Sequence, residues 1–557
     1  MPELTIKTAE GDRHIEFSPG QTLREVLDTT NFRVRSGCGG TGACGLCRVR
    51  IAARDAVEPT PVERIYLSDD QLASGMRLAC QVTPSREMEV VVLNRDPVSA
   101  WRAISSPFRC NSRSDTSPDV SALDLPRDIE RPYGVAVDLG TTHISVSFHD
   151  LLSGKWFAGR HGPNPQGAHG SDVMTRLQAA SESPLLAERM QRQVVDAVGS
   201  AIFDVAAREG IGSEQVARLV LVANTAMLGL LSGRNHHLLL DPAHWMGPID
   251  CLPESPKDLS RDWGIHPEAS VEIMPPLAGF VGSDLLAGCV ALDIASGDAG
   301  DLFIDFGTNS EIALWDGKEI WVTSAAGGPA FEGCGISCGM PAEPGAIYQV
   351  LGPGDSGNSP NAGNGFIVGN ASAPDMRFRT IDDAKPAGLC GSGIVDLIAC
   401  LVRSNKLTSI GRFAPGVSPD GLVFLDAERK LVLTKNDVDM FQRAKSAISA
   451  GIRVLLSLAG MGHDDLRRVY VGGAFGHFLN RENAVRVGLL PDMGREAVHL
   501  CGNIALGGCE RLLMTSRPTE LLMDLKNRTR IINLSHCDDF ADFFLEGLYL
   551  DRWPQEA

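Results

Sequence analysis

The spacing of apolar residues near the N-terminus predicts a small sheet crossed by one helix. Residues 3–8 and 13–17 alternate between apolar and polar side chains around a Glu-Gly-Asp turn, which is typical of a β-hairpin. A capping box that starts at Thr22 predicts the beginning of a helix. Two further apolar strands are expected at 47–52 and 87–93. This order of elements predicts an α+β domain of the β-grasp type.

Most of the remaining chain has an α/β pattern. Apolar strands run into glycine-rich or polar turns, and helical stretches lie between them. The clearest helix spans 434–459, where Thr434 is the expected N-cap, Asp437 occupies the third helical position and apolar residues form one stripe. The clearest strands are expected at 134–139, 219–223, 302–306 and 468–471.

Two segments lack a regular pattern. In residues 95–131, prolines alternate with Ser, Asp and Arg, which favours a semi-extended linker, although a small linker domain with its own helix stays an alternative. Residues 352–373 are rich in Gly, Pro, Ser and Asn and are expected to form a flexible surface loop.

Composition narrows the class of protein. A chain of 557 residues is long enough for about three or four domains. Its net charge of -18 disfavours a general nucleic-acid-binding protein, which would carry a basic face. No apolar stretch approaches the roughly 20 residues of a membrane span, and the first residues lack the pattern of a signal peptide. We therefore expect a cytoplasmic protein that binds neither nucleic acid nor membranes.

Four cysteines carry the first chemical signal. Cys38, Cys44 and Cys47 have the spacing C-x5-C-x2-C, and Cys80 follows far downstream. Three thiolates from one loop and a fourth from a distant segment are the ligand arrangement of a [2Fe–2S] ferredoxin, and glycines around them allow the backbone to approach the sulfurs. Zinc would favour paired C-x2-C knuckles, of which only one occurs, and disulfides suit secreted scaffolds. Residues 1–94 are therefore predicted to be a [2Fe–2S] ferredoxin-like β-grasp domain.

Two strands end in nearly the same residues. Asp138 is followed by Leu-Gly-Thr-Thr, and Asp305 by Phe-Gly-Thr-Asn. In such a turn, glycine lets backbone N–H groups face a phosphate, a hydroxyl adds a donor and the carboxylate can hold Mg²⁺ through water. One such turn is a weak signal because hairpins use the same residues, but two copies about one lobe apart are a stronger one. The predicted phosphate contacts are Gly140, Thr141, Thr142, Gly307, Thr308 and Asn309.

A third element follows at a similar distance. The strand that ends at Gly472 and Gly473, with Gly476 close behind, would let the backbone lie flat against a purine and its ribose. The order of the three elements resembles the ASKHA superfamily of ATPases, which includes sugar kinases, heat-shock chaperones and actin. This resemblance implies ATP as a ligand. It also implies that the Asp138 turn is the first phosphate motif, the Asp305 turn the second, and Gly472-Gly473 the adenosine motif.

The resemblance divides the rest of the chain into the two lobes of an α/β ATPase, at 132–297 and 298–557. The catalytic carboxylates of Asp138 and Asp305 would then face each other across one cleft.

A second assignment of the nucleotide motifs stays open. Asp305 could open a complete C-terminal ATPase domain in which 388–393 supply a later phosphate loop, and Asp138 would then belong to a degenerate companion domain. The even spacing of the three motifs favours the two-lobed arrangement.

The whole chain resembles the reductive activators of corrinoid-dependent methyltransferases. This resemblance implies that electrons from an upstream donor pass through the [2Fe–2S] cluster, and that ATP drives the one-electron reduction of Co(II) to Co(I) in a separate corrinoid protein. The cobalt is expected on that partner, because the chain has no D-x-H-x-x-G phrase. Analogy with ASKHA reductases alone implies a homodimer. Besides the motifs above, the resemblance rests on 164–166, 222–227, 279–284, 328–333, 390–393 and 501–503.

Three other functions fit parts of the sequence. Activators of 2-hydroxyacyl-CoA dehydratases also join iron–sulfur chemistry to an ASKHA fold, but they resemble homodimers that share one [4Fe–4S] cluster and lack a ferredoxin domain. A non-catalytic electron-carrier scaffold would have lost its ATPase activity, whereas both aspartates and both Gly-Thr turns are present. A sugar kinase would have no use for the cysteine loop. His143 and His477 flank the nucleotide motifs and are expected to be packing or surface residues.

Overall fold

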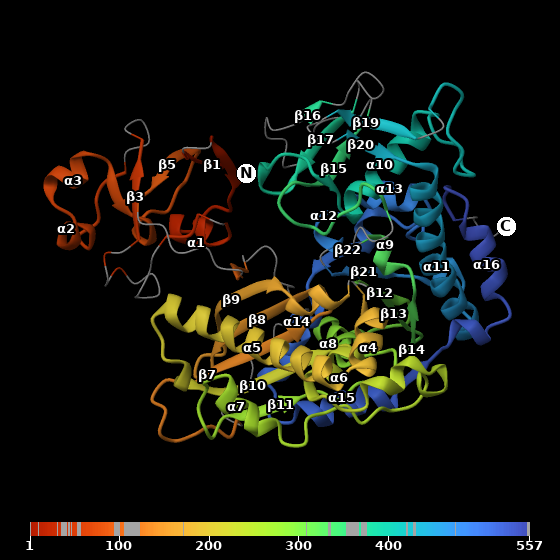
Figure 1. The fold of residues 1–557 in the computed structure, drawn as a ribbon, viewed down its shortest axis with the longest axis horizontal. Helices are drawn as coiled ribbons and strands as arrows, with labels where there is room; N and C mark the ends of the chain where they lie inside the picture. Colours follow the sequence, from red (N-terminus) through yellow and green to blue (C-terminus); the bar gives the residue numbers. More distant parts are fainter. Residues whose placement is uncertain are drawn as a thin grey trace.

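The computed structural model describes most of the chain. Three units follow one another: a small N-terminal domain, a middle domain and a C-terminal domain (Figure 1). Among the described residues, no helix is both long and apolar enough to cross a membrane. The described residues are 2–8, 11–30, 32–34, 42, 45, 47–52, 57–93, 101–104, 123–170, 172–307, 309–331, 336–352, 367–368, 376–418, 421–426, 430–473 and 475–553.

The N-terminal domain is a mixed five-stranded sheet in the order β2-β1-β5-β3-β4, crossed by helix α1. The hydroxyl of Thr22 accepts from the backbone N–H of Glu25, and the Glu25 carboxylate accepts from the backbone N–H of Thr22, so the predicted capping box is confirmed. Leu23 and Leu27 of α1 are buried on the sheet. The predicted β-grasp arrangement is therefore confirmed. The elements are β1 (Glu3–Ile6), β2 (Arg13–Glu16), α1 (Leu23–Asp28), β3 (Arg48–Ile51), α2 (Glu63–Tyr66), α3 (Asp69–Ala73), β4 (Met76–Leu78) and β5 (Met88–Val92).

The middle domain is a six-stranded sheet in the order β11-β10-β7-β8-β9-β6. Three antiparallel strands, β7 to β9, adjoin two strands, β10 and β11, that run parallel to β7. Helices cover both faces, so β10 is buried along its whole length. The elements are β6 (Arg102–Ala103), β7 (Tyr133–Leu139), β8 (His143–Asp150), β9 (Lys155–Pro163), α4 (Val173–Glu182), α5 (Pro184–Glu209), β10 (Val216–Ala223), α6 (Thr225–Ser232), α7 (Leu259–Asp262), β11 (Ser270–Ile273) and α8 (Ser283–Leu292).

The C-terminal domain repeats this topology. Its main sheet has the order β22-β21-β12-β13-β14-β23, with β12 to β14 antiparallel and β21 and β22 parallel to β12. The elements of this sheet and its helices are β12 (Asp301–Phe306), β13 (Ser310–Trp315), β14 (Ile320–Ala325), α9 (Gly328–Phe331), α11 (Lys435–Ala459), β21 (Arg468–Gly472), α12 (Phe475–Phe478), α13 (Arg481–Arg486), β22 (Val498–Gly502), α14 (Ile504–Leu513), α15 (Pro518–Asn527), β23 (Thr529–Ile531) and α16 (Phe540–Gly547).

A subdomain is inserted between α9 and α11. It contains the small sheet β16-β17-β15-β18, the hairpin β19-β20 and helix α10. Figure 1 shows this subdomain above the middle domain. Its elements are β15 (Ala346–Leu351), β16 (Ile367–Val368), β17 (Arg377–Thr380), β18 (Gly388–Leu389), α10 (Gly391–Arg403), β19 (Leu422–Asp426) and β20 (Lys430–Leu433).

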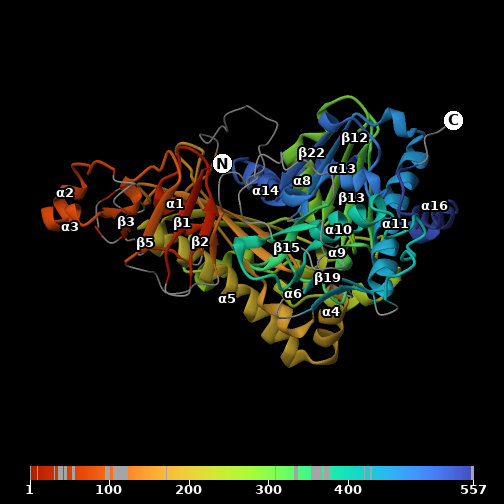
Figure 2. The same cartoon turned by 90° about the horizontal axis from the view of Figure 1, so that it is seen from above.

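The middle and C-terminal domains share a hydrophobic core. Helix α14 of the C-terminal domain packs on α8 and β7 of the middle domain, and the Cys509 thiol donates to the carbonyl oxygens of Val137 and Val220 at 3.5 and 3.2 Å. Phe303 and Leu285 belong to the same buried cluster although they come from different domains. Figure 2 shows α14 beside α8. Because this core is continuous, the ends of β7 and β12 are held at one interface.

Three predictions made from local sequence can be compared with the structure: the N-cap of α11, the linker 95–131 and the surface loop 352–373. Helix α11 begins after Thr434, whose side chain accepts from the backbone N–H of Asp437, so the predicted N-cap is confirmed. Parts of the predicted linker 95–131 pack on the middle domain: Trp101 is buried, and β6 pairs with β9. Residues 94–100 and 105–122 lie outside the described residues. Most of the predicted flexible loop also lies outside them, but Ile367–Val368 form β16 on the edge of β17.

Candidate functional site

Two of the predicted cluster ligands lie side by side. Cys47 precedes β3, and Cys80 lies in the 3-10 turn Ala79–Gln81 that follows β4. Because β3 and β4 are antiparallel neighbours, these two positions meet at one end of the sheet, and the Sγ atoms are 3.4 Å apart. Both thiols are buried. Cys38 and Cys44 lie outside the described residues.

The surroundings of these thiols fit a metal cluster. A hydrogen bond from Cys47 lowers the pKa of the Cys80 thiol to about 6, against the opposing effect of burial, and the Gln81 amide contributes to the shift. Thiolates are the form that iron–sulfur clusters bind. Gly42 and Gly45 have φ of +87° and +63°, and a Cβ on Gly45 would lie 2.8 Å from the Tyr66 ring. The glycines thus allow a tight loop that a residue with a side chain would disrupt.

The Asp138 turn is held by side chains from two other segments. The Asn164 amide donates to the carbonyl oxygen of Gly140 at 2.9 Å, and the Asn224 amide donates to the hydroxyl of Thr141, also at 2.9 Å. A Cβ on Gly140 would lie 2.6 Å from the carbonyl oxygen of His143. Asn164 and Asn224 belong to phrases that carried the family resemblance, and their contacts give those phrases a structural role in shaping this turn.

The Asp305 turn lies against the glycine pair of the predicted adenosine motif. Asp305 is opposite Gly472 in the parallel β12–β21 register. Gly473 has φ +81°, and a Cβ there would lie 2.2 Å from the carbonyl oxygen of Phe306 and 3.1 Å from the Asp305 carboxylate. Its N–H donates to Gly502 at 2.9 Å. The structure therefore brings the second and third predicted motifs into contact.

The end of each glycine motif is also fixed by the backbone. The N–H of Gly307 donates to the carbonyl oxygen of Asn309 at 3.1 Å, which closes the second turn, and Gly476 donates to Gly473 at 3.0 Å. Thr308 lies outside the described residues, as does the side chain of His477. The ring of Phe306 packs on Phe475 of α12, with ring centroids 4.7 Å apart.

Four half-buried carboxyl groups converge between the two turns. Burial raises the pKa of Asp138 to about 7; a 2.7 Å hydrogen bond from the Asn503 amide opposes the rise, and the charge of Asp284 adds to it. Burial, followed by the charges of Asp284 and Asp138, raises the pKa of Asp305 to about 7. Since the charge of Asp284 acts on both Asp138 and Asp305, and that of Asp138 acts on Asp305, the three carboxyl groups lie close together. Glu311 is the fourth member of this acidic group.

Asp284 and Glu311 were not among the predicted site residues, although Asp284 belongs to the segment 279–284 that carried the family resemblance. Asp284 lies in the first turn of α8, and burial raises its pKa to about 6. Glu311 is directly opposite Asp305 in the β12–β13 register, and burial together with the charges of Asp284 and Asp305 holds its pKa well above the usual range. Ser324 donates to it at 3.3 Å. A charged residue inside the otherwise apolar strand β13 is the sequence signal that could have found Glu311.

This acidic group does not form a ready-made metal cage. Among the described residues, no three His, Cys, Asp or Glu side chains lie close enough to hold one ion. Mg²⁺ commonly binds proteins through one or two carboxylates, with water and substrate phosphates filling the other positions. The arrangement therefore suits an ion that arrives with a nucleotide.

A small cavity joins the two turns to the inserted subdomain. Thr142 and His143 line it from the middle domain, and Gly307 from the C-terminal domain. Gly391 and Ser392 also line it, at the start of α10. The N-terminal end of a helix favours phosphate groups. The phosphate loop of the second sequence assignment, 388–393, thus lies in the same cavity as both turns of the first assignment.

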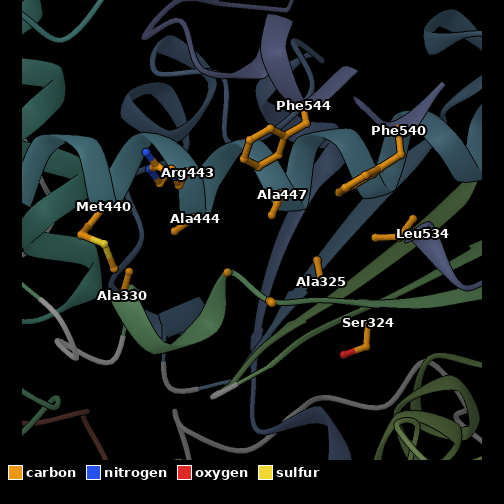
Figure 3. A pocket seen from close by; sticks show the side chains of 12 residues that line it. Ser324, Ala325, Ala330, Met440, Arg443, Ala444, Ala447, Leu534, Phe540 and Phe544 are labelled. Carbon is orange, nitrogen blue, oxygen red and sulfur yellow. The ribbon is translucent and has the colours of Figure 1, made fainter. Parts of the chain in front are cut away.

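A larger cavity, of about 460 Å³, lies elsewhere and contains none of the predicted site residues. It is mostly apolar and is bounded by the end of β14, by α9, α11 and α16. In Figure 3, Ala444 and Ala447 of α11 point toward the strand end that carries Ala325. Ala330 lines this cavity, whereas its neighbour Phe331 lines the smaller one, so α9 separates the two. The predicted motif residues Thr142 and Gly307 line the smaller cavity, and no predicted site residue lines the larger one.

The raised pKa values of Asp138 and Asp305 predict a pH-dependent stability. Folding raises both pKa values from about 4 to about 7, so the folded protein binds these protons more tightly than the unfolded chain. Their contribution is complete below about pH 4 and is lost as the pH rises through 7. We expect the melting temperature without ligands to fall less steeply between pH 5 and 8 in the D138N/D305N variant than in the wild type.

The matched control for this experiment is Asp298→Asn, because Asp298 is an exposed carboxylate that pairs with Arg467. Differential scanning fluorimetry across the pH range measures all three proteins. An unchanged slope in the D138N/D305N variant would contradict the buried acidic group.

Comparison with known families covers nearly the whole chain. Residues 7–85 match the 2Fe-2S iron-sulfur cluster binding domain, and 133–296 match the RACo middle region. Residues 300–556 match the C-terminal domain of RACo, described as the ASKHA domain. The predicted fold class, a ferredoxin domain followed by an ASKHA-type α/β domain, is confirmed.

Individual proteins with similar sequences or structures belong to the same group as these family matches. The corrinoid activation enzyme RamQ of Eubacterium limosum is 30% identical over 440 residues, which are 75% of this chain and 70% of the relative. A Co(II) methylated amine-specific corrinoid protein reductase of Methanosarcina barkeri is 26% identical over 449 residues, 76% of this chain and 77% of the relative. The solved structure of a reductive activator for corrinoid, iron-sulfur protein has the same fold, with a TM-score of 0.62, 24% identity and coverage of 99% of this chain and 98% of that chain. The chain therefore belongs to the family of reductive activators of corrinoid proteins.

Proposed function

We propose that this protein is an ATP-dependent one-electron reductase that returns a corrinoid protein from Co(II) to Co(I). The observation that carries the proposal is the combination, in one chain of this family, of two features: adjacent cysteine thiols in a ferredoxin domain, and half-buried carboxyl groups that converge between the two glycine turns. The activity would support a corrinoid-dependent methyltransferase or demethylase system, with the cobalt on the partner and electrons supplied by an upstream donor.

The ferredoxin domain would hold the electron carrier. Cys38, Cys44, Cys47 and Cys80 are the proposed ligands of a [2Fe–2S] cluster, which stores one electron when bound. The 3.4 Å separation of the Cys47 and Cys80 sulfurs and the lowered pKa of Cys80 support this ligand set. The Gln81 amide, 3.6 Å from the Cys80 sulfur, would help to stabilise the thiolate.

The cleft would bind ATP with Mg²⁺. Asp138 and Asp305 would orient the ion and its water around the terminal phosphate, as phosphoryl transfer relies on positioning and electrostatic stabilisation. The flat glycine surface next to Asp305 would take the adenosine. The residues proposed to contact phosphate are Gly140, Thr141, Thr142, Gly307, Thr308 and Asn309, and those proposed to contact adenosine are Gly472, Gly473 and Gly476.

ATP has a clear energetic role in this scheme. A one-electron step that is uphill by ~0.1 V costs about 2.3 kcal/mol. A nucleotide that binds two conformations with different affinities can supply a free energy of this size. The cleft lies between domains that share one core, so closure around a nucleotide can be transmitted through α8 and α14.

Formation of Co(I) tests the proposal directly. The purified protein is mixed with a Co(II) corrinoid protein and a chemical reductant, and the absorbance of Co(I) is followed with and without ATP. We expect Co(I) to accumulate only with ATP. Equal rates in both samples would contradict the proposal. Electron paramagnetic resonance of the reduced protein separates a [2Fe–2S] centre from the [4Fe–4S] centre of a dehydratase activator.

Assembly and location are proposed by analogy alone. The family resemblance favours a homodimer, and the composition favours the cytoplasm. Light scattering at micromolar concentration measures the assembly state, and a monomer there would contradict the dimer.

A further inference from the structure

A network of buried ion pairs joins the ferredoxin domain to the middle domain. Helix α1 of the ferredoxin domain lies against the C-terminal end of α5 and against β6, the edge strand next to β9. The arginines of the network are at most 5% exposed. We call this group the interdomain ion network, and its members are Arg24, Asp28, Arg33, Arg160, Asp204, Arg208 and Glu209.

The contacts form one continuous chain across the interface. One nitrogen of the Arg24 guanidinium donates to both carboxylate oxygens of Glu209, each at 2.9 Å. Arg160 donates to Glu209 at 3.2 Å and to Asp204 at 2.6 Å. Arg33 of the ferredoxin domain closes the chain by donating to Asp204 at 3.0 Å. Positive and negative charges therefore alternate along the network, which starts and ends on arginines of the ferredoxin domain and passes through the middle domain.

A second branch returns to Arg24 from the other side. Arg208 of the middle domain donates to Asp28, whose carboxylate also lies 3.3 Å from the Arg24 guanidinium. Arg24 thus has one carboxylate from its own domain and one from the middle domain. If the domains separate, Arg24 keeps Asp28 and loses Glu209.

Charge, rather than apolar packing, dominates this contact. Within the described residues, the hydrophobic cluster of the ferredoxin domain contains no residue of another domain. A smaller polar contact, between Glu16 and Arg379 at 3.9 Å, joins the ferredoxin domain to the inserted subdomain. Buried ion pairs define geometry while adding little net stability, because desolvation offsets their attraction. Such a contact can specify one docked position of the ferredoxin domain and still allow this domain to separate from the middle domain.

The same arginine interacts with the cluster ligands. The N–H of Leu23 donates to the carbonyl oxygen of Val82 at 2.7 Å, which ties the start of α1 to the segment that follows Cys80. Helix α1 packs on the 3-10 turn Ala79–Gln81 that carries Cys80, and the Arg24 guanidinium interacts electrostatically with the Cys47 thiol. Its positive charge is therefore shared between the proposed cluster site and Glu209.

This position has a consequence for electron transfer. Reduction adds one negative charge to a cluster, so a nearby positive charge stabilises the reduced form and raises the reduction potential. A carboxylate that neutralises the arginine weakens this effect. We propose that Arg24 is a positioning residue that couples the reduction potential of the [2Fe–2S] centre to docking of the ferredoxin domain on the middle domain; this rests on the proposed cluster function.

Coupling of this kind works in both directions. If docking changes the potential, reduction must change the docking equilibrium by the same free energy. The arrival of an electron from the upstream donor therefore alters how tightly the middle domain holds the ferredoxin domain. The domain that must deliver the electron to the cobalt is thus regulated by its own redox state.

Redox titration of the full-length protein with its cluster tests the first half of the proposal. Electron paramagnetic resonance gives the midpoint potential. We expect a more negative midpoint in Arg24→Gln, a midpoint near the wild-type value in Arg24→Lys, and a more positive midpoint in Glu209→Gln. Arg234→Gln is the matched control, because Arg234 pairs with Asp250 elsewhere on the middle domain. An unchanged midpoint in both Arg24→Gln and Glu209→Gln would overturn the proposal.

Small-angle X-ray scattering against salt concentration tests the second half. Salt weakens contacts between complementary charges, so the protein is expected to expand as the salt rises. We expect the salt concentration at half-expansion to differ between the oxidised and reduced wild type, and to be the same for both states in Arg24→Gln. Equal values in the oxidised and reduced wild type would overturn the coupling. Glu209→Gln leaves the ferredoxin domain unaltered, which keeps the test valid if Arg24→Gln fails to retain its cluster.

These measurements need neither ATP nor the corrinoid partner. A wild-type protein that shows no [2Fe–2S] signal would contradict the proposed function itself. A normal signal with an unresponsive potential would contradict only the role of Arg24.

Discussion

The Asp305→Asn variant is expected to lose ATP-dependent reduction of the corrinoid partner by at least about 10²-fold, the usual cost of removing one preorganised charge-stabilising group. Its [2Fe–2S] spectrum should be unchanged, because the ferredoxin domain has a separate hydrophobic core. Asp305 lies half-buried near Asp138 and Asp284 and against the glycine pair of the predicted adenosine motif. Asparagine keeps the shape of the side chain but cannot carry the charge that an ion and a terminal phosphate require. The rate of Co(I) formation and the rate of ATP hydrolysis measure the loss.

Asp138→Asn separates the two assignments of the nucleotide motifs. The repeated sheet topology gives Asp138 and Asp305 equivalent positions in two lobes, whereas the matched family describes 300–556 as the ASKHA domain. In the two-lobed arrangement, D138N and D305N each lose ATPase activity, and the double variant loses little more, because both residues serve one metal–phosphate unit. Normal ATPase activity in D138N alone would favour a complete C-terminal ATPase domain. Asp298→Asn, which removes an exposed carboxylate, is the control.

Local chemistry in the sequence predicted much of this fold. The hydroxyl of Thr22 caps the helix that its capping box predicted, and the hydroxyl of Thr434 is the N-cap that was predicted for α11. In both cases the capping residue and its partner are three residues apart, so residues that are close in the sequence are also in contact in the structure. The glycines of the nucleotide motifs were also identifiable, because a positive φ such as that of Gly473 restricts the choice of residue.

Contacts between distant segments could not be predicted in this way. Asp284 is an ordinary residue in the first turn of a helix until the fold brings it to Asp138 and Asp305. Arg24 and Glu209 are 185 residues apart and lie in different domains. In a helix, arginine is usually a solvent-exposed residue, so no periodic pattern marks Arg24 as buried. Such contacts depend on how whole domains pack.

The Cys80→Ala variant is expected to lose the [2Fe–2S] cluster. The Cys80 sulfur lies 3.4 Å from that of Cys47, and its lowered pKa makes it a ready ligand. Removing one of four thiolate ligands leaves an iron site incomplete. Apart from Cys47 and Cys80, the described cysteines lie in other domains and offer no substitute ligand. Iron content per chain and visible absorbance measure the loss. Full iron content in Cys80→Ala would contradict the ligand assignment.

The control for this variant is Cys537→Ala, because that half-buried thiol donates to Asn533 in the C-terminal domain and is remote from the cluster ligands. It should keep its iron. Cys80→Ala should also keep ATP binding, since the cleft is built from the middle and C-terminal domains and their shared core. Asp305→Asn should show the reverse pattern, with the cluster retained and the ATPase lost. These opposite losses would place electron storage and nucleotide chemistry in separate parts of the chain, so that the contact between domains must connect them.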